Sequence, residues 1–210
     1  MINKIFVFGD SIAHGVWDDE MGGWVNRLRN FLMNKATDPN WTEVYELGVN
    51  GDTSENLLNR FEFETFHRTI PEQGDIFIFA IGINDSAFLT ENDNNFIAKI
   101  PFKDNLQYLI TLVKKYSERI VFVGLTPVNE KKTSPKGGII CYENKYIEEY
   151  NKIIKLTCEA NGLLFIDVLG EFEKVDYYKL LDEDGLHPNS KGHQKIFKIV
   201  KDSLEKNKLI

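Results

Sequence analysis

The feature that most constrains the fold is an apolar run near the N-terminus that ends abruptly in small polar residues. Ile-Phe-Val-Phe at residues 5–8 is followed at once by Gly9, Asp10 and Ser11. β-Branched and aromatic side chains without a polar interruption indicate a strand that is buried on both faces. Strands of this kind occur inside parallel sheets whose two faces are covered by helices. The run therefore predicts an α/β fold.

Strand and helix signals alternate along the rest of the chain, with no repeat, low-complexity segment or linker to divide it. Apolar runs predict further strands at residues 44–49, 76–81, 120–125 and 163–167. Apolar stripes of helical period predict helices at residues 24–35, after 53, around 106–113, at 144–161 and from 190 onward. Because each right-handed crossover covers one face of the sheet, the pattern predicts one domain, residues 1–210, built as a three-layer α/β/α sandwich.

One long segment, residues 126–142, has the composition of a loop. It is rich in Pro, Gly, Lys and other polar residues. Loops of this length in compact domains are usually functional or disordered. We expect this one to be mobile and to overhang a ligand crevice, and its polarity is unlike that of a lipase lid.

Composition and charge exclude several classes of function. Lys and Arg total 25 against 32 Asp and Glu, a net charge of -7, and the basic residues are dispersed, so nucleic acid is not an expected partner. The first residues lead directly into a strand and no apolar run approaches a membrane span, which predicts a cytoplasmic protein without signal peptide or membrane insertion. Cys141 and Cys158 lack metal-ligand spacing and are expected to be packing residues in a reducing compartment. The oligomeric state is not predicted.

Ser11 stands where the first strand ends. In open α/β sheets, ligands bind in the crevice at the carboxyl ends of the strands, which makes Ser11 a candidate nucleophile. Ser and Asp are also the preferred residues at helix N-caps. This segment alone slightly favours the capping role.

A second segment, Asp-Gly-Leu-His-Pro at residues 184–188, holds the groups that a serine nucleophile needs. An imidazole can take the hydroxyl proton, and a carboxylate can fix the tautomer of that imidazole. Gly185 permits a tight turn between Asp184 and His187, while Pro188 favours an extended backbone at His187. Taken alone, the segment is equally well explained as a surface turn before the last helix.

Four short blocks together resemble the SGNH (GDSL-type) hydrolase family. They are Gly9-Asp10-Ser11-Ile12, Gly48-Val49-Asn50-Gly51-Asp52-Thr53, Gly82-Ile83-Asn84-Asp85 and Asp184-Gly185-Leu186-His187-Pro188, in the family's order. The resemblance implies a flavodoxin-like fold with a five-stranded parallel sheet in the order 2-1-3-4-5. It also implies Ser11 as nucleophile, His187 as base and Asp184 as the acid that orients the base. The implied oxyanion hole consists of the backbone N–H groups of Ser11 and Gly51 and the side-chain amide of Asn84.

The chemistry of these residues suits the implied roles, although structural roles stay open. Glycine at position 51 lets a backbone N–H approach a reacting oxygen, but turns also use glycine. An uncharged amide such as that of Asn84 can donate hydrogen bonds to a transient oxyanion, and an Asx-turn is its structural alternative. Asp10 and Asp85 are expected to brace loops through backbone N–H groups.

The remaining histidines do not suggest a metal site. His14 follows Ser11 on a turn without an evident carboxylate partner and is expected at most at the rim of the pocket. His67 and His193 lie on predicted helices, where surface or structural roles are expected. A metal-dependent phosphoesterase needs His and Asp ligands from several strand ends. No complete set is present, so neither a metal nor a cofactor is expected.

The sequence thus predicts a serine esterase that acts through an acyl-serine intermediate. Small soluble esters, such as acetyl groups on sugars or small alcohols, are the expected substrates. Lysophospholipids and acyl thioesters stay open as substrates, as does a non-catalytic binding module of the same fold, which the intact set of Ser11, Asp184 and His187 disfavours. The aromatic residues that could line an acyl pocket, where they do not belong to the core, are Trp17, Phe61, Phe63, Phe66 and Phe88.

Overall fold

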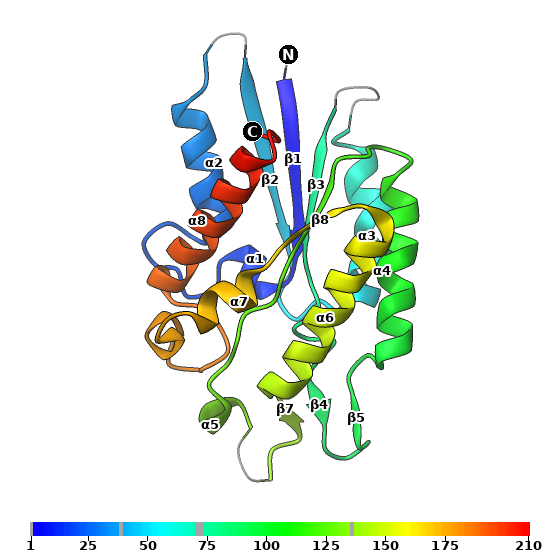
Figure 1. Cartoon of the computed structure of the whole chain (residues 1–210), viewed down its shortest axis with the longest axis vertical. Coiled ribbons are helices and arrows are strands. Elements are labelled where there is room, and N and C mark those ends of the chain that lie inside the picture. The colour runs from blue at the N-terminus through cyan, green and yellow to red at the C-terminus, as the bar shows by residue number, and fades with distance from the viewer. Residues whose placement is uncertain (1, 38–39, 70–73, 135–136) are drawn as a thin grey trace.

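A five-stranded parallel sheet forms the centre of the molecule (Figure 1). The structure is a computed structural model that describes residues 2–37, 40–69, 74–134 and 137–210. Neighbouring strands pair in the order β2-β1-β3-β6-β8. Their bounds are Ile2–Gly9 for β1, Trp41–Gly48 for β2, Ile76–Ala80 for β3, Ile120–Val123 for β6 and Leu164–Ile166 for β8. The predicted sheet and its order are confirmed, with β6 and β8 as the fourth and fifth predicted strands.

Helices cover both faces of this sheet, which gives the three predicted layers (Figure 1). The first and last long helices, α2 and α8, lie on one face, while α3, α4 and α6 lie on the other. Their bounds are Trp24–Asn34 for α2, Ser54–Phe66 for α3, Lys99–Val113 for α4, Asn144–Asn161 for α6 and Ser190–Lys206 for α8. Helix α4 begins before Pro101, because proline is tolerated in the first turn of a helix.

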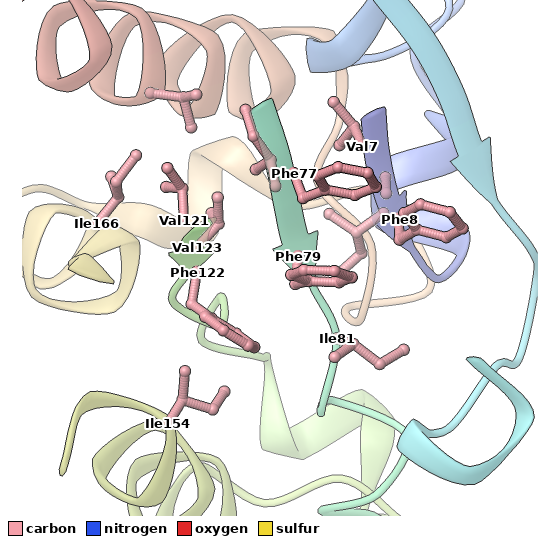
Figure 2. Packing of buried hydrophobic residues seen from close by; sticks show 14 of the residues in the cluster. Val7, Phe8, Phe77, Phe79, Ile81, Val121, Phe122, Val123, Ile154 and Ile166 are labelled. Carbon is pink, nitrogen blue, oxygen red and sulfur yellow. The ribbon is translucent and has the colours of Figure 1, made fainter. Parts of the chain in front are cut away.

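The central strands are buried on both faces, as their continuous apolar runs predict. On the face covered by α3, α4 and α6, Phe8, Phe79 and Phe122 follow one another across β1, β3 and β6. Phe61 of α3 packs on Phe8 and Phe79. Figure 2 shows the Phe122 ring pointing towards Ile154 of α6. This aromatic layer fixes the register of the strands whose ends carry the candidate site.

The carboxyl ends of the strands lie at one end of the molecule, together with a second, smaller sheet (Figure 1). Strands β4 (Phe88–Leu89), β5 (Asn94–Asn95) and β7 (Ile140–Cys141) form this antiparallel sheet in the order β5-β4-β7. The expectation of one long loop at residues 126–142 is wrong for the residues described, because the segment contains helix α5 (Glu130–Thr133) and strand β7. Residues 135–136 lie outside the described ranges. Elements of two to four residues are too short to show a hydrophobic period.

The fold also contains three short helical elements that the sequence did not predict. They are α1 (Ser11–His14), α7 (Val168–Glu173) and a 3-10 helix at Tyr177–Leu180. Cys141 and Cys158 are both buried and unpaired, as expected of packing residues. No helix in the described part of the chain combines the length and the apolar character that a membrane crossing requires.

Candidate active site

Ser11 lies at the carboxyl end of β1 and is the first residue of helix α1. Asp10 is the N-cap of this helix, and its side chain accepts a hydrogen bond from the Ile12 N–H at 2.9 Å. Asp10 therefore takes the capping role, while Ser11 stands at the strand end, where a nucleophile is expected. An N–H in the first turn of a helix has no acceptor within the helix, so the Ser11 N–H is left for other partners.

His187 lies within hydrogen-bonding distance of both Ser11 and Asp184. Its Nε2 atom is 2.8 Å from Oγ of Ser11, and its Nδ1 atom is 2.6 Å from Oδ2 of Asp184. Gly185, between the two residues, has a φ of +76°, a left-handed backbone that glycine adopts without strain. The structure thus brings the predicted nucleophile, base and acid together, although Ser11 and His187 are 176 positions apart.

Asp184 accepts four hydrogen bonds, two on each carboxylate oxygen. Oδ1 accepts from the backbone N–H groups of Leu186 at 2.8 Å and His187 at 3.0 Å, and Oδ2 accepts from the His187 imidazole and from Nε1 of Trp17 at 2.9 Å. Partial burial acts to raise the pKa of Asp184, but the hydrogen bonds from His187 and Leu186 outweigh it and hold this pKa below its usual value. The carboxylate is therefore ionised at neutral pH.

The ionisation of Asp184 decides which tautomer of His187 is present. An ionised carboxylate only accepts hydrogen bonds, so Nδ1 of His187 must carry a proton. In the neutral imidazole, Nε2 then has a free lone pair and accepts the hydrogen bond of the Ser11 hydroxyl. This is the arrangement in which an imidazole can remove a proton from Ser11.

Gly51 lies in the loop after β2, beside the end of β1. Its φ is +80°, and beyond its two chain neighbours no residue has an atom within 4 Å of the point where a Cβ would stand. Arg60 of α3 ties this loop to β1, because its Nε lies 2.6 Å from Oδ2 of Asp52 and its Nη2 donates to the Gly9 carbonyl at 3.0 Å. The backbone around Gly51 is thus both open to a ligand and held next to the strand that leads to Ser11.

Asn84 is buried in the loop that follows β3. Its Nδ2 atom donates to the Asp52 carbonyl at 2.9 Å, and its Oδ1 atom accepts from the Tyr142 hydroxyl at 3.0 Å. Both partners belong to other segments of the chain, which distinguishes this side chain from an Asx-turn. Since the bond to Asp52 uses one of the two amide hydrogens, the other is left to donate to a ligand.

Two carboxylates are buried beneath these loops. Asp85 accepts hydrogen bonds from both the backbone N–H and the hydroxyl of Ser54, so it joins the end of β3 to the start of α3. Burial raises the pKa of Asp85 to about 6 and that of Asp10 to about 7. The expectation that Asp10 and Asp85 brace their loops through backbone N–H groups is confirmed.

The aromatic residues expected near an acyl pocket lie elsewhere for the most part. Phe61 is buried in the core, and Phe63 and Phe66 are exposed in the half of α3 that runs away from the strand ends. Phe88 of β4 stacks on Tyr146. Of these five residues, only Trp17 lies beside Asp184, to which its indole donates a hydrogen bond, and this side chain is 56% exposed.

One histidine departs from expectation, and the two on helices take the two roles expected of them. His14 does have a carboxylate partner, because Oε2 of Glu46 lies 3.3 Å from its Nδ1. His193 has the structural role that was one of the two alternatives, because it is completely buried and its Nε2 atom lies 3.0 Å from the Val16 carbonyl. His67 is exposed at the end of α3, as expected. Val16 directly precedes Trp17 in the chain. The contact of His193 with Val16 therefore supports the loop that carries the Trp17 indole.

Sequence reasoning missed two polar contacts of the site. Trp17 stood among the candidate acyl-pocket residues, and nothing in its sequence position indicates a hydrogen bond to Asp184. Tyr142 lies at the edge of a segment with loop composition, so its contact with Asn84 also left no local signal. Both contacts join segments that only the folded chain brings together.

The α/β/α fold, which solved structures share, and the match to a family of acylhydrolases together define the class of this protein. The chain matches the GDSL-like Lipase/Acylhydrolase family over residues 7–195 and belongs to that family.

Similar proteins span nearly the whole chain. Two are from Bacillus subtilis (strain 168): the uncharacterized lipoprotein YqeF is 24% identical over 225 residues, covering 94% of this chain and 88% of that protein. The uncharacterized protein YpmR is 22% identical over 219 residues, covering 98% of this chain and 82% of that protein.

Solved structures share the fold. A lipase/acylhydrolase from Enterococcus faecalis superposes with a TM-score of 0.77 at 22% identity, covering 98% of this chain and 96% of that one. Axe2, an acetylxylan esterase from Geobacillus stearothermophilus, superposes with a TM-score of 0.72 at 19% identity, covering 95% and 92% of the two chains.

Proposed function

We propose that the protein is a serine esterase that hydrolyses small soluble acyl esters through an acyl-serine intermediate. The observation that carries the proposal is the chain of hydrogen bonds from Ser11 through His187 to Asp184. This chain of hydrogen bonds lies near the carboxyl ends of β1, β2 and β3. Gly51 and Asn84, in the loops after β2 and β3, supply N–H donors for an oxyanion. A nucleophile, a base, an orienting acid and an oxyanion site are the parts that acyl transfer requires.

In the first step, His187 removes the hydroxyl proton of Ser11 while Oγ attacks the ester carbonyl carbon. The electron pair of the carbonyl bond moves onto the oxygen, and the N–H groups of Ser11, Gly51 and Asn84 stabilise the resulting oxyanion. Ionised Asp184 stabilises the imidazolium that His187 becomes. When the oxyanion collapses, the bond to the alcohol breaks and the alcohol takes the proton from His187, leaving an acyl-serine.

Water completes the reaction by the same steps. His187 takes a proton from a water molecule, whose oxygen attacks the acyl carbon and forms a second oxyanion in the same site. Collapse of this intermediate breaks the bond to Ser11, and the serine oxygen takes the proton back from His187. The products are a carboxylic acid and the regenerated enzyme, so neither step needs a co-reactant other than water.

A preference for short acyl groups is supported by the surroundings of Ser11 and by the solved neighbours. Ser11 is only 7% exposed, and exposed lysines at positions 131 and 132 lie on α5 at the same end of the molecule. Axe2 is named an acetylxylan esterase, and it has been solved as catalytic mutants in which a serine or a histidine is replaced by alanine. A cytoplasmic location stays a prediction.

The test is hydrolysis of p-nitrophenyl esters from acetate to palmitate by the wild type, Ser11→Ala and the control Ser203→Ala, which lies on α8. We expect the highest kcat/KM at acetate or butyrate, loss of activity in Ser11→Ala, and no change in Ser203→Ala. A fluorophosphonate should label Ser11, as identified by peptide mass spectrometry.

Other outcomes of this test would each overturn part of the proposal. A maximum at long acyl chains would indicate a lysophospholipase. When acyl thioesters of matched chain length are assayed beside the esters, faster cleavage of the thioesters would indicate a thioesterase. A folded wild type that neither hydrolyses any ester nor reacts with the fluorophosphonate would be a binding module of the same fold.

A further inference from the structure

The segment between β6 and α6 forms hydrogen bonds with the turn that carries Asp184. We call its residues 128–134 and 137–142 the strap. The Asn129 N–H donates to the Gly185 carbonyl at 2.8 Å, and Nζ of Lys132 donates to the Glu183 carbonyl at 2.6 Å. A side chain at position 185 would come within 2.9 Å of Cβ of Lys132. One end of the strap therefore packs directly against the turn that holds Asp184.

The other end of the strap places Tyr142 on Asn84. The Tyr142 backbone is held on both sides by Thr133, whose carbonyl accepts the Tyr142 N–H at 3.0 Å and whose hydroxyl donates to the Tyr142 carbonyl at 2.7 Å. From this anchored backbone, the half-buried side chain reaches Asn84, and its hydroxyl donates to Oδ1 at 3.0 Å. A single segment thus contacts both the turn that carries Asp184 and Asn84.

The contacts of the Asn84 amide leave one hydrogen free. The Asp52 carbonyl can only accept, so Nδ2 of Asn84 must face it and Oδ1 must face Tyr142. A hydrogen bond donated to the oxygen of an amide polarises the group and strengthens its remaining N–H as a donor. Burial, with the nearby Asp10, raises the pKa of the Tyr142 hydroxyl, which therefore keeps its proton at neutral pH and stays a donor.

We propose that Tyr142 is a positioning residue of the oxyanion hole, whose hydroxyl fixes and polarises the Asn84 amide so that its free N–H points at the reacting oxygen. The inference rests on the proposed function for the identity of that oxygen. Tyr142 itself does not touch the reacting atoms in this account, and acts through Asn84 alone.

The experiment compares Tyr142→Phe, which removes only the hydroxyl, with the control Tyr108→Phe on the exposed side of α4. A lost hydrogen bond of ordinary strength lowers kcat by about 3- to 10-fold, and we expect KM to stay within about twofold. The control should match the wild type. Because Tyr142 acts through Asn84, adding Tyr142→Phe to Asn84→Ala should cost less than about twofold.

An equal loss in both backgrounds, a loss confined to KM, or an unchanged kcat would overturn the proposal. A second measurement does not depend on activity. The side-chain amide hydrogens of Asn84, followed by NMR on nitrogen-15-labelled protein, should exchange with water faster in Tyr142→Phe than in the wild type. Unchanged exchange would overturn the positioning role, whereas a wild type without esterase activity but with faster exchange in the variant would contradict only the proposed function.

Discussion

The two sides of Ser11 are built in different ways. On the histidine side, His187, Asp184 and Trp17 meet on a surface turn, and the Asp184 side chain is 35% exposed. On the other side, which we call the oxyanion side after its proposed role, Asn84 and Asp85 follow a buried strand, and Asp10, Asn84 and Asp85 are all at most 9% exposed. Hydrogen bonds connect the residues on both sides, but those of the oxyanion side are buried in the strand ends, whereas those of the histidine side lie in a partly exposed turn.

This difference decides which carboxylate near Ser11 can assist an imidazole. Asp10 is adjacent to Ser11 in the sequence, but burial raises its pKa to about 7, so at neutral pH much of it is protonated. Asp184 is far away in the sequence, yet its hydrogen bonds with His187 and Leu186 outweigh its partial burial and keep it ionised. Closeness to Ser11 in the sequence therefore does not identify the carboxylate that assists His187. The burial and hydrogen bonds of each carboxyl group do identify it.

The largest effect is expected from removing the charge on the histidine side. Asp184→Asn cannot stabilise an imidazolium, and its NH2 group would face groups that now donate to Asp184. We expect kcat to fall by about 10³- to 10⁴-fold. The control is Asp182→Asn in the same loop, which should stay within about twofold of the wild type. Steady-state kinetics on p-nitrophenyl acetate check both, and equal activity of the two variants would remove Asp184 from the mechanism.

Removing the donor on the oxyanion side is expected to cost less. Asn84→Ala loses one of three N–H donors, so kcat should fall by about 10²- to 10³-fold with little change in KM. Asn92→Ala, at an exposed position between β4 and β5, is the matched control and should leave kcat unchanged. If the rate of Asn84→Ala equals that of the wild type, the oxyanion hole is assigned to the wrong residues.

A smaller loss of kcat is expected when the indole that donates a hydrogen bond to Asp184 is replaced. Trp17→Phe keeps an aromatic ring but removes the N–H that donates to Oδ2, which should lower kcat by about 2- to 5-fold. Trp41→Phe is the matched control, because Trp41 is also exposed but lies at the start of β2, the opposite end of the strand from the site. Identical kinetics of the two variants would show that the hydrogen bond to Trp17 does not matter for catalysis.

The fourth prediction concerns stability on the oxyanion side. Between its ordinary pKa of 3.8 and the folded value of about 7, Asp10 holds a proton in the folded state that it lacks in the unfolded state. Its contribution to stability is therefore complete below about pH 4 and is lost as the pH rises to about 7. Asp10→Asn keeps the cap on Ile12 without a charge.

Thermal melts at pH 4, 6 and 8 check this prediction. The melting temperature of Asp10→Asn should equal that of the wild type near pH 4 and exceed it by several degrees at pH 8, since about 1 kcal/mol corresponds to about 2–4 °C in a chain of this size. Asp104→Asn, at an exposed position on α4, should show no such trend. A difference that stays constant with pH would mean that folding does not raise the pKa of Asp10.

Much of the fold and the geometry of the site follow from local patterns in the sequence. The apolar runs locate all five parallel strands, and the short blocks around Ser11, Gly51, Asn84 and His187 identify residues that the structure brings together. The strap was not predicted, because α5 and β7 are too short to show a period and are held by contacts with distant segments. The contacts of Trp17 and Tyr142 depend on side chains that meet across 167 and 58 positions, which no local pattern records.

The same separation along the chain has a consequence for folding kinetics. Ser11, Gly51, Asn84 and His187 come from four segments between the first strand and the last helix, so no short fragment of the chain contains all four. Parallel sheets with contacts this far apart form slowly, after local helices have appeared. Helix content can therefore recover early during refolding, whereas ester hydrolysis can return only when the N-terminal strand and the loop before α8 have docked.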